Sequence, residues 1–170
     1  MASIVKKTNN RLKFLYRHRN ALNFKTRKLL ANALIFSHFD YAMVAWYPIL
    51  SKTLKEKLQI AQNKVVRFVL ELGPRSHIGQ NELDRIGVLK VSDRAKQLTL
   101  HQMFHIYYRT APKYLLDLFR RNSNPYTRTN QNNFAIPRSN GSTKPFSVTG
   151  AMEWNNLSVT TNCIANFQQF

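Results

Sequence analysis

Lysine and arginine are the chemically active side chains that gather most clearly in this sequence. Residues 1–28 hold nine of them and no Asp or Glu. Such a run suits a solvated helix face, but it also attracts phosphate groups, and with no acid to balance it we favour phosphate contact. A second, smaller band of positive charge lies in residues 57–67. The candidate nucleic-acid-binding residues are Lys6, Lys7, Arg11, Lys13, Arg17, Lys25, Arg27, Lys28, Lys57, Lys64 and Arg67.

The charge of the whole chain points the same way. Its 170 residues include 26 Lys or Arg against 8 Asp or Glu, which gives a formal net charge of +18. A folded domain this basic repels itself unless it has an anionic partner. Nucleic acid is the first candidate, and an anionic membrane surface is the second. The hydrophobic content of 44% argues for a folded core and against general disorder.

Catalytic and metal-binding patterns do not emerge from the remaining polar residues. The eight carboxylates are scattered, and the nearest pair, Glu82 and Asp84, is spaced so that the two would not face each other on a helix. His101 and His105 stand one helical turn apart, but no Glu lies between them and no Cys is near, so ordinary packing is the better interpretation. The five glycines form no phosphate loop. We therefore expect no active site, no metal and no cofactor.

Cysteine content and hydropathy bear on the compartment. The lone Cys163 excludes an internal disulfide and fits a reducing environment, and lysines and arginines interrupt any apolar run at the N-terminus. The apolar stretch from Leu29 to Trp46 contains His38 and Asp40, so a buried helix is a better interpretation than a membrane span. These features predict an intracellular protein without a membrane partner.

The helix expected over Ser51–Leu72 organises the elements that position these residues. Its apolar residues recur at intervals of four and three, which keeps them on one helical face. Thr53 and Glu56 resemble a capping box at its start, and Gly73 with Pro74 resembles a stop. The buried face is predicted to consist of Leu54, Leu58, Ala61, Val65, Phe68 and Leu72.

Other helices are expected over residues 3–19, from the Asn23 cap towards Trp46, over 82–86, over 92–109 and over 113–119. In the second of these, Asp40 shares a face with Leu29 and Ala33, which we expect to pack against Leu58 and Phe68. A carboxylate on an apolar face needs a partner. We therefore predict that Asp40 is a buried structural group paired with a basic residue, and the candidates are Arg17, Arg67 and Arg94.

The composition changes after Arg121. Residues 122–145 are polar and rich in turn-forming types, with a short strand predicted at Phe134–Ile136. Phe146 and Trp154 restore aromatic character, and we expect the segment Phe146–Leu157 to act as an aromatic clasp on the helical body; base stacking on these rings is the alternative. The predicted fold is mainly α: a bundle of about five helices in a basic domain, 1–121, followed by an irregular polar tail, 122–170.

Several short phrases occur in a fixed order along the chain. They are Leu29-Leu30 with His38-Phe39-Asp40-Tyr41 and Trp46; Leu58-Gln59, Gln62-Asn63 and Arg67-Phe68; Ala111-Pro112 with Tyr114-Leu115; and Thr127-Arg128, Phe146, Gly150-Ala151 and Trp154-Asn155 with Leu157. In this order and spacing they resemble the region after the polymerase domain in reverse transcriptases of jockey-like non-LTR retrotransposons. The resemblance extends over nearly the whole chain, from about Leu12 to Leu157. One departure is Ser158, where the family usually has Pro.

The resemblance implies the thumb-side, C-terminal part of an RNA-directed DNA polymerase. The polymerase palm, with its Tyr-x-Asp-Asp hairpin, and the endonuclease of the family have no match here, so no catalytic residue carries over. We expect RNA or DNA to be bound through phosphates, with the rest of a reverse transcriptase as a further partner. A non-catalytic module that docks on the polymerase core, a decayed non-functional copy, and a basic membrane-surface protein remain alternatives.

Overall fold

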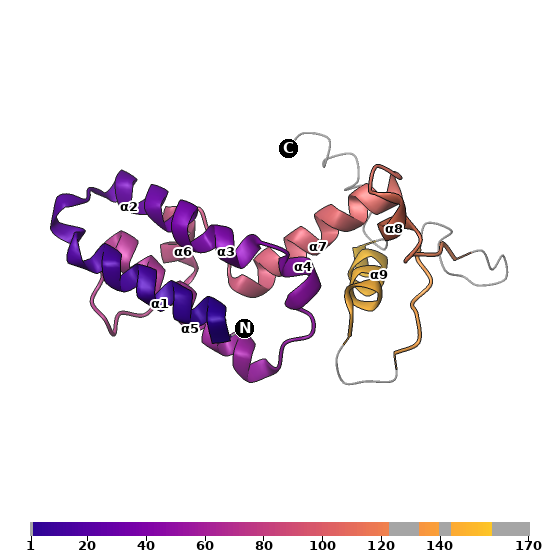
Figure 1. Cartoon of the computed structure of the whole chain (residues 1–170), viewed down its shortest axis with the longest axis horizontal. Helices are drawn as coiled ribbons and strands as arrows, with labels where there is room; N and C mark the ends of the chain where they lie inside the picture. Colours follow the sequence, from indigo (N-terminus) through magenta and orange to yellow (C-terminus); the bar gives the residue numbers. More distant parts are fainter. Residues whose placement is uncertain (1, 123–132, 140–143, 158–170) are drawn as a thin grey trace. The chain divides into compact units, whose positions relative to one another are not determined.

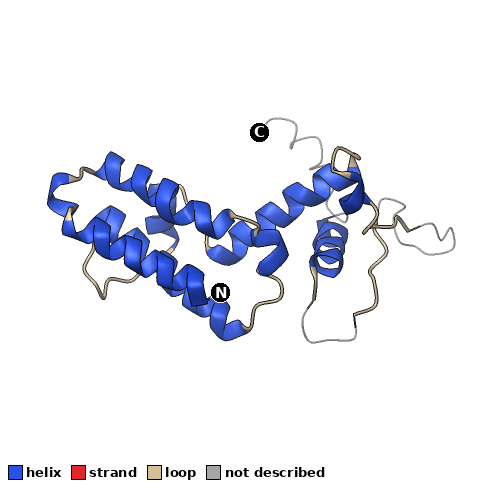
Figure 2. Cartoon of the chain, in the orientation of Figure 1, coloured by secondary structure: helices blue, strands red, loops and turns tan. Residues whose placement is uncertain are grey.

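The computed structural model describes residues 2–122, 133–139 and 144–157, and within them the chain is mainly helical (Figures 1 and 2). It divides into two compact units, Met1–Ala95 and Lys96–Phe170. The boundary expected after residue 121 therefore falls inside the second unit. Cys163 and the Thr127-Arg128 phrase lie outside the described residues.

The first unit is built around α5, Lys52–Leu70, against which α1, Ala2–Arg17, and α2, Phe24–Ala31, both pack (Figure 1). The predicted buried face of α5 is confirmed at its centre, because Leu58, Ala61, Val65 and Phe68 are each at most 2% exposed. Leu54 and Leu72, at its two ends, are only half-buried. From α1, Leu12 and Leu15 complete this core. Helices α1 and α5 therefore each have one apolar face turned inward, as the spacing of their residues requires.

The ends of α5 differ from the expected caps. Ser51, and not Thr53, is the N-cap, and its hydroxyl accepts from the Leu54 N–H at 3.4 Å. At the other end Glu71 adopts a left-handed conformation with φ 56°, and the Leu72 N–H donates to the Arg67 carbonyl at 2.9 Å. The helix thus closes two residues before Gly73, through a residue other than glycine.

The segment after Asn23 is not one regular helix. The Asn23 side chain caps α2 as expected, accepting from the Thr26 N–H at 2.9 Å. A π-helical turn, η2, Asn32–Phe36, then leads into α3, Ser37–Asp40, and Ala42 with φ 50° breaks the helix before α4, Met43–Trp46. The expectation that Leu29 and Ala33 face the core is wrong, since both are exposed; the buried residues are Arg27, Ala31, Ile35, Phe39 and Met43.

A polar contact fixes the start of α7, Val91–Tyr107, on α5. The Gln59 side chain accepts from the Val91 N–H at 3.1 Å, and Gln62, only 2% exposed, donates to the Leu89 carbonyl at 2.7 Å. Between α5 and α7 lies α6, Gln80–Ile86, whose first turn is held by Glu82 accepting from the Gly79 N–H at 2.7 Å. Earlier in the chain a 3-10 turn, η1, Arg19–Ala21, connects α1 to α2. Paired side chains therefore satisfy buried backbone groups at these junctions.

The second unit is an aromatic core around the later turns of α7. It contains α8, Lys113–Leu116, and α9, Phe146–Leu157, so the expected clasp is a helix and not irregular chain. Trp154 is 6% exposed and stacks on Tyr107 with ring centroids 5.0 Å apart, which confirms that it is buried. Phe146 packs on Phe119 at 5.3 Å.

The predicted strand at Phe134–Ile136 is reduced to a single antiparallel bridge between Arg121 and Phe134. Asn155 of α9 holds this bridge: its side chain accepts from the Phe134 N–H at 2.9 Å and donates to the Phe134 carbonyl at 2.8 Å. The polar chain that follows Arg121 is in this way attached to the helical core by the motif Trp154-Asn155.

Candidate nucleic-acid interface

The exposed side of α1 carries the clearest set of free positive charges in the first unit. Lys6, Lys13 and Arg17 are exposed and are spaced at intervals of seven and four residues, which places them on one stripe of the helix. Lys7, also exposed, lies on a neighbouring stripe. The sequence of α1 contains no acid, and its buried residues Leu12 and Leu15 lie on the opposite side. This arrangement leaves a positive helix face open to an anionic partner.

Arg11 has a different role from the one expected. It is half-buried, and its guanidinium donates to the carbonyl of Leu34 in the π-helical turn. One of its N–H groups therefore satisfies a backbone acceptor between two elements of the core, so part of its guanidinium is already used. The pKa of the neighbouring His38 is lowered, first by desolvation and then by the positive charges of Arg11 and Lys7.

Arg27 is a second correction, because it is buried at 5% exposure. Its Nη1 lies 2.6 Å from Glu71 Oε1 in an ion pair, and its Nε has no hydrogen-bond partner among the described atoms. The pKa of Glu71 is lowered because Arg27 lies close enough to donate to it, and the charges of Arg27 and Arg19 act in the same direction. Arg27 is thus an internal ion-pair residue.

Arg67 and Arg19 join this ion pair around one hollow of about 310 Å³, bounded also by Tyr16 and Phe68. The Arg67 Nε donates to the Ser76 carbonyl at 2.8 Å, so part of its guanidinium is already used. The structure therefore brings together Arg27 and Arg67, two of the predicted residues, with Arg19, which we did not select. Burial raises the pKa of Tyr16, and the charges of Arg19 and Arg67 oppose that rise.

The remaining candidates lie on other helices. Lys25 on α2 is exposed and Lys28 is half-buried. On α5, Lys57 and Lys64 are exposed and form a separate stripe with Ile60, away from the buried Leu58. The free candidates are therefore divided between a stripe on α1 and one on α5, with single lysines on α2.

Asp40 does meet a basic residue, but it is not buried. The Arg94 guanidinium donates two hydrogen bonds to the Asp40 carboxylate, from Nε to Oδ1 at 3.0 Å and from Nη2 to Oδ2 at 2.6 Å. The Asp40 side chain is 35% exposed and that of Arg94 is 38% exposed. Its hydrogen bonds to Asp40 are the main cause that raises the pKa of Arg94. This pair joins α3 to the first turns of α7 within the first unit.

Metal and membrane features are also informative. The His101 and His105 rings meet edge to face at 4.8 Å, and His105 Nδ1 lies 2.8 Å from the Thr110 hydroxyl. Among the described residues no three His, Cys, Asp or Glu side chains gather as metal ligands. In the same part of the chain, no helix combines the length and apolar character that crossing a membrane requires.

Comparison with protein-family models, curated proteins and solved structures finds no match for this chain.

Proposed function

We propose that this chain binds nucleic acid through phosphate groups, with little sequence specificity, by the exposed face of α1. The observation that carries the proposal is the stripe Lys6, Lys13 and Arg17, which is exposed along one side of a helix without acids. Phosphate contacts of this kind position a protein on nucleic acid but carry no sequence information. Lys7 adds a further charge beside the stripe.

The order of the sequence phrases supports a more specific role. We propose that the chain is the region that follows the polymerase domain of a retrotransposon reverse transcriptase, and that it supports reverse transcription without catalysis of its own. Asp40, the acid in the His-Phe-Asp-Tyr phrase, is engaged by Arg94, which favours a structural role for that phrase. The acid nearest to Arg27, Glu71, is likewise used in an ion pair.

A salt titration tests the binding proposal. Each phosphate contact contributes about 0.9 to the slope of log affinity against log salt on duplex DNA and about 0.7 on a single strand. Replacing Lys6, Lys13 and Arg17 together by Gln should therefore flatten the slope by about two to three units and weaken all sequences alike. These three positions are better targets than Arg11, whose loss would also remove a backbone contact.

The matched control removes the same charge elsewhere. Lys52, Lys90 and Arg138 are exposed and belong to neither stripe, so their replacement by Gln lowers the net charge equally. The control should keep most of the salt slope. Equal flattening in both triple variants, or no binding by the wild-type chain at low salt, would contradict the proposal.

Docking on a protein partner is the second candidate function. Large apolar side chains of the first unit are exposed to solvent, among them Tyr41 at 80%, Leu29 at 66% and Ile60 at 54%. Exposed apolar side chains mark protein interfaces when they form a patch. This candidate gains if the chain fails to bind a single strand or a duplex and instead binds an isolated polymerase core, with Leu29→Ser and Ile60→Ser weakening that binding.

A further inference from the structure

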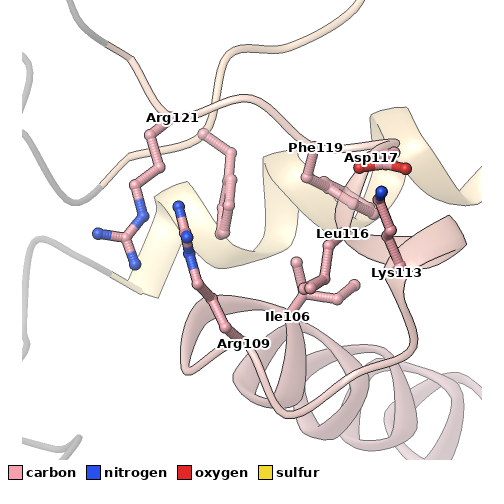
Figure 3. A pocket seen from close by; sticks show the side chains of 8 residues that line it. Ile106, Arg109, Lys113, Leu116, Asp117, Phe119 and Arg121 are labelled. Atoms are coloured by element: carbon pink, nitrogen blue, oxygen red, sulfur yellow. The ribbon is translucent and has the colours of Figure 1, made fainter.

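The second unit contains a pocket of about 420 Å³ that none of the predicted site residues line. It lies where the end of α7, α8 and the segment 119–121 meet (Figure 3), and Phe134 also lines it. This volume falls within the usual range of about 300–1,000 Å³ for small-molecule sites. The pocket is therefore large enough for a ligand the size of a nucleotide.

Part of its lining is apolar and belongs to the core. Phe119 and Phe134 are 8% and 4% exposed, and their ring centroids lie 5.6 Å apart in an edge contact. Ile106 is 4% exposed, and Leu116 packs against the same cluster. Such a surface suits a flat, weakly polar group whose desolvation costs little free energy.

Positive side chains surround this apolar surface. Figure 3 shows Arg109 and Arg121 on one side of the pocket, and Lys113 with Asp117 on the other. The lining thus carries three basic residues against one acid, and none of the ion pairs found among the described residues involves Arg109, Lys113 or Arg121. Three positive side chains around one pocket, with a single acid among them, favour an anion there.

Arg121 is already held in position. Its Nη2 donates to the Tyr107 carbonyl at 2.9 Å, and its guanidinium lies over the Tyr107 ring, 4.6 Å from the centroid. Arg109 itself adopts a left-handed backbone with φ 57°, two residues after the end of α7. A guanidinium presents N–H groups in a planar fork that matches phosphate oxygens, so two of them on one side form a phosphate-binding edge.

We propose that this pocket binds a nucleotide, with its phosphate at Arg109 and Arg121 and its base against Phe119 and Leu116. Phosphate recognition by arginine and contact of bases with aromatic side chains are the two means by which proteins hold single-stranded nucleic acid. The same chemistry is offered by a free mononucleotide and by the phosphorylated end of a strand. The pocket shares no residue with α1, so it does not depend on the α1 face.

Titration calorimetry on the full chain at low salt tests the proposal with AMP, adenosine and inorganic phosphate. AMP should bind at least tenfold more tightly than either fragment, because only AMP fills both halves of the site. Arg109→Gln should weaken AMP about tenfold, the usual effect of losing a charge-assisted hydrogen bond. Asp117→Asn should strengthen AMP binding, because it removes the acid of the lining.

The controls separate this site from general charge and from the α1 face. Arg138→Gln makes the same charge change at an exposed position of the second unit and should leave AMP binding unchanged, as should the α1 triple variant. A single-stranded hexanucleotide with a 5′-phosphate that displaces AMP better than the unphosphorylated strand would assign the site to strand ends; failure to displace would assign it to free nucleotide.

The proposal is overturned if AMP binds no better than phosphate, or if Arg109→Gln and Arg138→Gln weaken it equally. A thermal melt of each variant checks the fold. If Arg109→Gln melts early, Arg109→Gly relieves the left-handed backbone and removes the same charge. Loss of AMP binding in that folded variant supports the site, and retention overturns it.

Discussion

The pair between Asp40 and Arg94 gives the sharpest test of how exposure sets the strength of an ion pair. Breaking a buried pair costs about 3–5 kcal/mol, whereas exposed pairs contribute about 0–1 kcal/mol. Both side chains here are more than a third exposed, so water screens much of their attraction. Their two-point geometry, with contacts of 3.0 and 2.6 Å, raises the value above that of an ordinary surface pair.

We expect a coupling free energy of about 1 kcal/mol between these two residues. A double-mutant cycle of Asp40→Ala, Arg94→Ala and the double variant, followed by urea unfolding, isolates this term. The cycle is needed because Asp40 is the last residue of α3, where a negative charge opposes the helix dipole, and alanine itself favours helix. The single variants alone would mix these effects.

Salt provides the internal check on the same cycle. In 1 M NaCl the screening length falls to about 3 Å, so the coupling should drop clearly below its value at low salt. A coupling above about 3 kcal/mol would mean that the pair behaves as buried, against the observed exposure. A coupling near zero at low salt would refute the inference that its geometry stabilises the junction of α3 and α7.

Two further predictions concern stability. The pKa values of Glu71 and Glu82 are lowered in the folded chain, so both carboxylates stabilise the fold above the usual carboxylate pKa range. This stabilisation is lost as pH falls through the lowered pKa values. The lowered pKa of His38 acts in the same direction, because the fold disfavours protonation of its ring. Urea midpoints should therefore fall on acidification from neutral pH, less so in Glu71→Gln, and a profile unchanged by that variant would contradict the account. Phe68→Ala should lower the free energy of unfolding by about 3–5 kcal/mol, because the residue is 2% exposed and its ring centroid lies 5.1 Å from that of Tyr16. A loss under about 1 kcal/mol in urea unfolding would show that the neighbouring side chains collapse into the cavity.

The sequence predicted helices well where one face repeats at helical spacing. The buried face of α5 followed from Leu58, Ala61, Val65 and Phe68 because their spacing is close to 3.6 residues. The buried positions of the stretch 27–43 do not follow from this spacing. Its buried positions recur every four residues, which in a regular α-helix would drift by about 40° per step. The wider turn at Asn32–Phe36 absorbs part of this drift.

Charge counts located the candidate interface but could not assign each side chain. Arg11 and Arg27 belong to the same basic run as Lys6 and Arg17, yet contacts distant in sequence, to Leu34 and Glu71, take both into the core. The pocket in the second unit was missed because its positive residues are spread over 109–121 among apolar ones. Only the turn after α7 and the bridge from Arg121 to Phe134 bring them to one edge.

The π-helical turn at Asn32–Phe36 also determines where the chain can lose a residue. A π turn holds one residue more than an α turn, and the helix on either side keeps its facing. Deleting the exposed Ala33 would change the spacing of Ala31, Ile35, Phe39 and Met43 to three, four and four, which an ordinary α-helix satisfies. The same deletion at exposed Ile60 in α5 would rotate all later residues by about 100° and turn Val65 and Phe68 out of the core. We therefore expect this chain to tolerate a one-residue deletion at the π turn and not within α5.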